Sequence, residues 1–218
     1  KILSQLFITK DRKLWLELLK RKNYRKNKYP FSYEYEAKVE QIEGSANYIE
    51  LKSLKILNET LYKQKLEMMK SSLLKVGTLL PIRIGLYDSG ALLLILMDEL
   101  GIGFDMSFAK IPFSIAILED IKNNELPAQR LDEVEFALEE YREKQEEKIS
   151  TLTQSKPLNT GDYGLRGVNV YDAWFYRDYL YTTYFLAYED NENQQVLHGN
   201  YLLEIDNGRI KKIFLDEE

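Results

Sequence analysis

The spacing of apolar residues changes once along this chain, and that change constrains the fold more than any other feature. Up to residue 155, apolar side chains recur every three or four positions, as in Leu14 and Leu18. This spacing places them on one side of a helix. After Pro157, β-branched and aromatic residues alternate with polar ones, which is typical of strands. The sequence therefore predicts an α+β protein, with a mainly α-helical domain over residues 1–155 and a small antiparallel β module over 156–218.

The helical part is divided by prolines, glycines and capping residues. A Lys/Arg/Asn cluster precedes Pro30, and Ser32 is a suitable N-cap for a long helix that runs to about Leu57. Asp88 or Ser89 is expected to begin the most apolar helix, which Gly101 and Gly103 stop. The remaining predicted helices are one or two between residue 2 and the basic cluster, then residues 58–73, 112–123 and 131 to about 152.

The β module is predicted from alternating segments separated by turns. Asn207-Gly208 is a strong signal for a two-residue hairpin, and residues 190–193 form a second expected turn. The expected strands cover residues 168–171, 180–188, 196–205 and 210–215.

Composition excludes several classes of protein. A net charge of -5 gives no electrostatic footprint for nucleic acid, although residues 20–28 are locally basic. The chain has no cysteine, so it can form no disulfide, thiolate metal site or cysteine nucleophile. No run of about 18 apolar residues occurs, so we expect no transmembrane segment and a soluble protein. Composition leaves both a cytoplasmic and an extracytoplasmic location open.

Carboxylates gather on the predicted helix before Leu57. Glu36, Glu40, Glu43 and Glu50 step by four, three and seven residues, which predicts that they share one helical face. A carboxylate at the edge of an apolar stripe is costly unless a cation, a proton or a donor meets it. This helix is therefore the first place to look for chemistry.

Two motifs give this region a resemblance to a known family. Residues 43–50 read Glu-Gly-Ser-Ala-Asn-Tyr-Ile-Glu, and residues 86–93 read Leu-Tyr-Asp-Ser-Gly-Ala-Leu-Leu. In this order they resemble segments of the gluzincins, the zinc peptidases of the thermolysin and aminopeptidase N group. The resemblance implies that Glu43 is the third zinc ligand and that the Tyr87 hydroxyl stabilises the oxyanion formed during hydrolysis of a peptide or protein substrate.

The sequence departs from that family in one respect. It contains no HExxH motif, and its single histidine, His198, lies in an expected strand. The zinc ligands are therefore incomplete within this chain, and zinc is expected only if upstream ligands exist. Either an HExxH helix precedes Lys1, or the chain is a degenerate, inactive relative. A non-catalytic peptide- or protein-binding module is the alternative, and a purely structural domain with solvated carboxylates is a third.

Other residues near the two motifs have less specific roles. Glu36 and Glu40 are candidates for polar support of the site or for an acid pair, because carboxylates one turn apart raise one another's pKa. Arg83 is a candidate to bind a substrate carboxylate or to pair with one of these glutamates. Ser89 lacks a GxSxG context and no GxxxxGK motif occurs, which argues against a serine hydrolase and a nucleotide enzyme.

Overall fold

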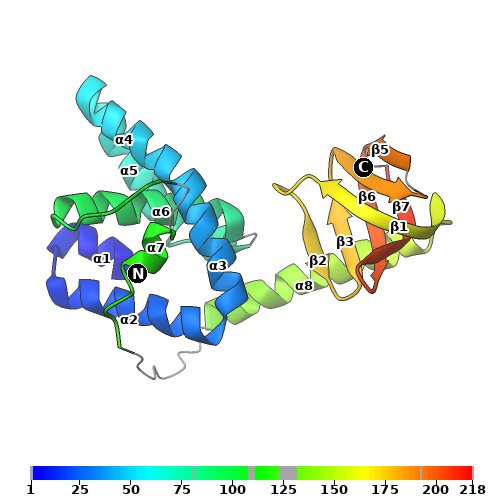
Figure 1. Cartoon of the computed structure of the whole chain (residues 1–218), viewed down its shortest axis with the longest axis horizontal. Coiled ribbons are helices and arrows are strands. Elements are labelled where there is room, and N and C mark those ends of the chain that lie inside the picture. Colours follow the sequence, from blue (N-terminus) through cyan, green and yellow to red (C-terminus); the bar gives the residue numbers. More distant parts are fainter. Residues whose placement is uncertain (1, 81, 108–110, 123–131, 192, 218) are drawn as a thin grey trace. The chain divides into compact units, whose positions relative to one another are not determined.

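The computed structural model describes residues 2–80, 82–107, 111–122, 132–191 and 193–217. The chain forms two compact units, Lys1–Leu131 and Asp132–Glu218 (Figure 1). The first is helical and the second combines one long helix with an antiparallel sheet, so the predicted α+β class is confirmed. The first strand, β1 (Asn159–Val168), ends where the first expected strand, 168–171, was predicted to begin, so that prediction was wrong. The compact units divide between residues 131 and 132, because α8 (Asp132–Thr153) packs on the sheet.

The first unit is built around its most apolar helix, α6 (Ile82–Glu99). Residues 91–97 of α6 are almost completely buried, and α6 packs against α1, α3, α4, α5 and the π-helical turn η1. In sequence order the unit contains α1 (Ile2–Thr9), α2 (Arg12–Lys28), α3 (Pro30–Val39), η1 (Glu40–Gly44), α4 (Ser45–Leu57), α5 (Glu59–Ser72), the 3-10 turn η2 (Val76–Leu79), α6 and the short α7 (Phe113–Ala116).

Local sequence signals explain several helix boundaries. The Asp11 side chain caps α2 by accepting from the backbone N–H of Lys13 at 2.8 Å, and Asn58 caps α5 through Leu61 at 3.1 Å. Pro30 occupies the first turn of α3, where its missing N–H costs nothing, so the helix begins before the expected cap at Ser32. Gly101 has a φ of +67°, which ends the α6 segment in a left-handed residue.

Two helix predictions differ from the structure. Helix α6 begins at Ile82 rather than at Asp88 or Ser89, so its first two turns include Arg83 and Tyr87. The helix expected over residues 112–123 is only the four residues of α7. Residue 123 and residue 131, the expected start of α8, lie outside the described residues.

The second unit contains a seven-stranded sheet in the order β2-β3-β6-β7-β1-β4-β5. Every pair of neighbouring strands is antiparallel, as predicted. Besides β1, the strands are β2 (Trp174–Tyr176), β3 (Tyr179–Thr182), β4 (Phe185–Asp190), β5 (Asn193–His198), β6 (Asn200–Asp206) and β7 (Arg209–Asp216). Asn207 and Gly208 both have positive φ, 51° and 74°, and form the predicted hairpin turn between β6 and β7.

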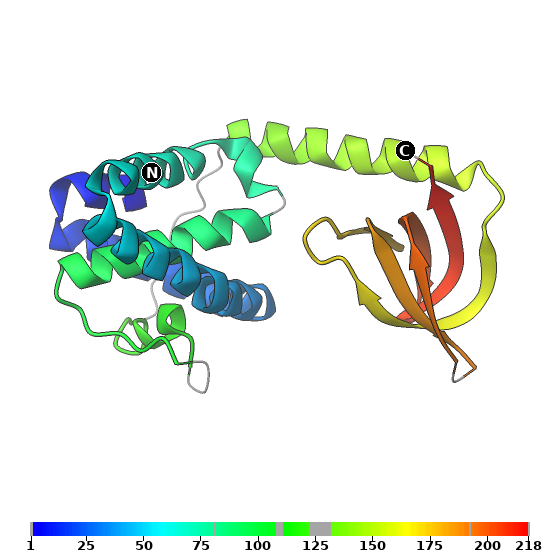
Figure 2. The ribbon, with the colours of Figure 1, turned by 90° about the horizontal axis from the view of Figure 1, so that it is seen from above.

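The sheet is strongly curved (Figure 2). It carries apolar side chains on both faces. One face encloses a core that includes Leu186, Leu203 and Ile213, while Leu202 and Phe214 pack with Leu152 of α8 on the other. Two expected strands are interrupted, at Tyr184 (φ 65°) and Gly199 (φ 140°). No helix in the described parts of the chain combines the length and apolarity needed to cross a membrane.

Candidate functional site

The helix that carries the predicted carboxylates is continuous from Pro30 to Leu57 but contains the π turn η1. A π turn holds one residue more than an α turn, so side chains after it are rotated relative to those before it. Glu36 on α3 and Glu40 at the start of η1 are buried, at 8% and 3% exposure. Glu43, later in η1, is half-buried, and Glu50 on α4 is exposed. The four carboxylates therefore do not share one face.

The two buried carboxylates belong to an inner network of Lys22, Arg25, Glu36, Glu40 and Ser89. Lys22 Nζ lies 3.0 and 3.1 Å from the two oxygens of Glu40, and the Ser89 hydroxyl donates to Glu40 Oε1 at 3.0 Å. Arg25 donates to both oxygens of Glu36, with its Nε 2.8 Å from Oε2. Because α2 and α3 are joined only at Tyr29, the cations of α2 lie opposite the carboxylates of α3 and η1.

The electrostatics of the inner network favour the charged pair. Burial by itself lowers the pKa of Lys22, but Glu40, Tyr33 and Glu36 together outweigh burial, so the pKa of Lys22 is raised. The hydrogen bond to Glu36 raises the pKa of Arg25. Burial raises the pKa of the neighbouring Tyr33 to about 12. These groups hold their protons through the physiological range, which is the behaviour of a structural network rather than of a proton-transfer site.

Glu43 and Tyr87 belong to a separate outer cluster, which consists of Tyr35, Glu43, Arg83 and Tyr87. Arg83 Nε donates to the Tyr87 hydroxyl at 3.2 Å, and its NH1 donates to the Tyr35 hydroxyl at 3.1 Å. The Arg83 NH2 group lies 3.4 Å from Glu43 Oε1. The structure therefore brings the two residues singled out by the motifs to one guanidinium.

The outer cluster is accessible and cationic at its centre. The Arg83 side chain is 18% exposed and the Glu43 side chain 27%. Burial lowers the pKa of Arg83, but hydrogen bonds to Tyr35 and Tyr87 more than offset it, so the pKa is raised. The long contact between Arg83 and Glu43 is weaker than a bidentate pair, so the carboxylate is held in place without being enclosed.

Glycines allow the two motifs to approach. A Cβ added to Gly44 would lie 2.7 Å from the Cα of Gly90, and one added to Gly90 would lie 2.8 Å from the carbonyl oxygen of Glu40. Neither is possible, so η1 and α6 touch backbone to backbone at this point. Both the inner network and the outer cluster take residues from these two elements: Glu40 and Ser89 in the first, Glu43, Arg83 and Tyr87 in the second.

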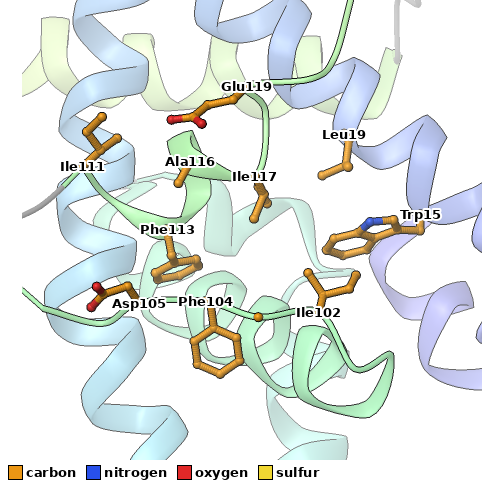
Figure 3. Close-up of a pocket in the computed structure, with 11 residues that line it drawn as sticks. Trp15, Leu19, Ile102, Phe104, Asp105, Ile111, Phe113, Ala116, Ile117 and Glu119 are labelled. Carbon is orange, nitrogen blue, oxygen red and sulfur yellow. The ribbon is translucent and has the colours of Figure 1, made fainter.

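A separate apolar pocket, here called the Trp15 pocket, lies in the same unit and has a volume of about 650 Å³ (Figure 3). Figure 3 shows Trp15, Leu19 and Ile102 at one side of the pocket, with Ile111 and Asp105 at the other. Its described lining consists of Trp15, Leu19, Ile102, Gly103, Phe104, Asp105, Ile111, Phe113, Ala116, Ile117 and Glu119.

Hydrogen bonds from the long helix and from α2 hold the wall of the Trp15 pocket. The backbone N–H of Phe113 donates to Gln41 Oε1 at 3.0 Å, and the Tyr33 hydroxyl donates to the carbonyl of Ser114, also at 3.0 Å. The amide of Asn23 donates to the carbonyl of Ile121 at 3.1 Å. The segment that carries α7 is thus tied to α2, α3 and η1.

A metal site is not complete in the described residues. No group of three His, Cys, Asp or Glu side chains that could hold a metal ion occurs among them. His198 lies exposed on β5, in the other unit. Of the ligands that the gluzincin resemblance implies, only Glu43 is present, and its described partner is the cation Arg83. One carboxylate beside a guanidinium does not by itself fit zinc, which takes three or four protein ligands.

Comparison with known proteins assigns no family to this chain. No protein-family model matches it, and neither a curated protein nor a solved structure shows detectable similarity.

Proposed function

We propose that the helical unit is a gluzincin-like peptidase domain that supplies the glutamate ligand and the tyrosine of a zinc site. The observation that carries the proposal is that Glu43 and Tyr87 both contact Arg83, at 3.4 and 3.2 Å. These residues come from motifs that follow one another in the order of that family, and the Gly44–Gly90 contact supports their approach.

Glu43 and Tyr87 have the chemistry that a zinc ligand and an oxyanion donor need. Glu43 provides a carboxylate that is accessible yet oriented by Arg83. Tyr87 provides a phenolic O–H, the type of donor that stabilises a developing oxyanion. Zinc in such peptidases activates water for attack on a peptide carbonyl. The other zinc ligands would come from outside the described residues, so we derive no catalytic step from this chain alone.

An uncovered apolar surface borders Glu43. Ile42, Ile49 and Ile56 are spaced by seven residues along η1 and α4, with exposures of 54%, 55% and 85%. The buried positions of the same helix include Glu36 and Glu40 instead. Exposed aliphatic side chains at heptad spacing suit the packing of another helix. In the peptidase proposal, that helix carries the HExxH motif.

The same surface is what favours the second candidate, a non-catalytic module that binds a peptide or a protein. In that case the isoleucine row packs against a partner, and Arg83 remains the permanent partner of Glu43. The two candidates differ in whether metal binding depends on Glu43.

The test uses the protein expressed from its complete gene. We expect bound zinc and peptide hydrolysis, both lost in Glu43→Gln. Glu50→Gln is the matched control, because Glu50 lies one heptad further along the same helix and pairs with Lys65 at the surface. Tyr87→Phe is expected to retain zinc and to lower kcat by at least tenfold.

Absence of an HExxH segment, or zinc content unchanged by Glu43→Gln, would overturn the peptidase proposal. A stable complex that forms without zinc, and that Ile49→Asp disrupts, would then support the binding module.

A further inference from the structure

The Trp15 pocket has the character of a preformed ligand site rather than a packing defect. Its volume of about 650 Å³ lies within the range of small-molecule and peptide side-chain sites. Phe113, at its centre in Figure 3, is 2% exposed. The hydrogen bonds of Phe113 with Gln41 and of Ser114 with Tyr33 fix this wall through contacts within the protein. A wall fixed in advance lowers the entropic cost of binding.

The lining of the pocket combines apolar walls with negative charge. Trp15, Leu19 and Ile102 form an apolar end. The carboxylates of Asp105 and Glu119 are the charged groups among the described lining residues. Asp105 also accepts from the backbone N–H of Ser107 at 2.8 Å, which orients it. A ligand that matches this apolar end and the exposed carboxylate of Glu119 has an apolar body and an adjacent positive charge.

Part of the pocket lining is exposed to solvent, which favours a peptide that lies across the pocket over an enclosed small molecule. Ala116, Glu119 and Gly103 are exposed although they line the pocket. A main chain can therefore run over this rim while its side chains enter. We propose that the Trp15 pocket binds a peptide segment in which a large apolar side chain adjoins a lysine or an arginine. This inference does not depend on zinc or on peptidase activity.

Binding in the pocket can be measured by the fluorescence of Trp15. The chain contains two tryptophans, and the other, Trp174, lies in the β unit. In a Trp174→Phe background, emission therefore reports Trp15 alone. The probes are acetyl-Leu-Phe-Arg-Leu-amide, the same peptide with Glu in place of Arg, and phenethylamine. We expect the Arg peptide to shift Trp15 emission and to bind at least tenfold more tightly than the Glu peptide.

Substitutions at the lining of the Trp15 pocket test whether the peptide binds there. Glu119→Gln should reduce the preference for Arg over Glu several-fold, whereas Glu34→Gln, at an exposed carboxylate on α3 that pairs with Lys38, should leave it unchanged. Ala116→Phe should fill the pocket and abolish the response. Ile111 is 56% exposed, so Ile111→Lys offers a second variant that should fold and repel the cationic peptide.

Equal binding of the Arg and Glu peptides, or no change in Trp15 emission at millimolar peptide, would overturn the proposal. Phenethylamine binding as tightly as the Arg peptide would also overturn it, because the ligand would then be a small amine.

Discussion

Glu40 and Glu43 lie three residues apart on one helix, yet they belong to very different environments. Glu40 is 3% exposed and its oxygens meet Lys22 and Ser89, whereas Glu43 is half-buried and its described partner, Arg83, is at a longer distance of 3.4 Å. The inner network uses its carboxylates to join α2 to η1 and α6. The outer cluster keeps its carboxylate accessible. Burial and pairing, rather than residue type, therefore separate a structural carboxylate from a candidate ligand.

The largest expected effect is the loss of Glu40. Glu40→Ala leaves the buried Lys22 ammonium without its carboxylate, which costs about 3–5 kcal/mol of unfolding free energy. Glu43→Ala should cost less than about 1 kcal/mol, because this pair is partly exposed. Denaturant unfolding followed by Trp15 emission, in the Trp174→Phe background, reports on the helical unit. Similar losses in the two variants would remove the distinction between inner and outer carboxylates.

The next largest expected effect is a loss of folding stability at alkaline pH. The folded-state pKa of Tyr33 is raised from 10.0 to about 12, and that of Lys22 is also raised. Above pH 10 the folded state therefore binds more protons than the unfolded state, so stability is fully present below pH 10 and falls as pH rises towards 12. Tyr33 accounts for about 2–3 kcal/mol of this fall.

Tyr33→Phe should flatten the pH dependence between pH 10 and 12, measured by the same unfolding assay. The comparison is made between slopes, because the variant also loses the hydrogen bond to Ser114 at every pH. An unchanged slope would show that Tyr33 titrates alike in the folded and unfolded states.

Substitution at the Gly44–Gly90 contact tests whether the inner network and the outer cluster depend on the same packing of η1 against α6. In Gly90→Ala the new Cβ meets the Glu40 backbone at 2.8 Å, and such overpacking costs about 1–3 kcal/mol. Gly77→Ala is the control, because nothing lies within 4 Å of its Cβ position. We expect Gly90→Ala also to weaken zinc or ligand binding at Glu43, whereas Gly77→Ala should change neither.

The smallest effect on stability is expected in the outer cluster. Arg83→Met removes the contacts with Glu43, Tyr35 and Tyr87, which are partly solvated, so the loss should be about 1 kcal/mol. A loss near that of Glu40→Ala would show that the cluster is structural. Far-UV circular dichroism at neutral pH should be unchanged.

Local signals made much of the fold predictable. The Asn207-Gly208 turn, the end of the long helix at Leu57 and the charged helix α8 follow from residues adjacent in sequence. The π turn did not follow, because no residue pattern in the sequence marks it, and it changed which face each glutamate occupies. The start of α6 was missed because Pro81 and the nearby glycines obscured its first turn.

The inner network had a signal that pattern analysis overlooked. Cations at 22 and 25 and carboxylates at 40 and 36 are spaced almost symmetrically about Pro30 and Phe31, as expected for partners across a helical hairpin. The Trp15 pocket had none, since its lining comes from α2, residues 102–105 and residues 111–119. Only the packing of these distant segments creates it.

The backbone contact between Gly44 and Gly90 has a consequence for how this protein can diverge. Because no side chain separates the two helices there, the distance between η1 and α6 is set by the main chain alone. Substitutions at Glu43, Arg83 or Tyr87 can therefore replace one chemistry by another without altering the frame that holds them. A lineage that loses a catalytic residue at this surface keeps its geometry, and a new activity can arise there by exchange of side chains.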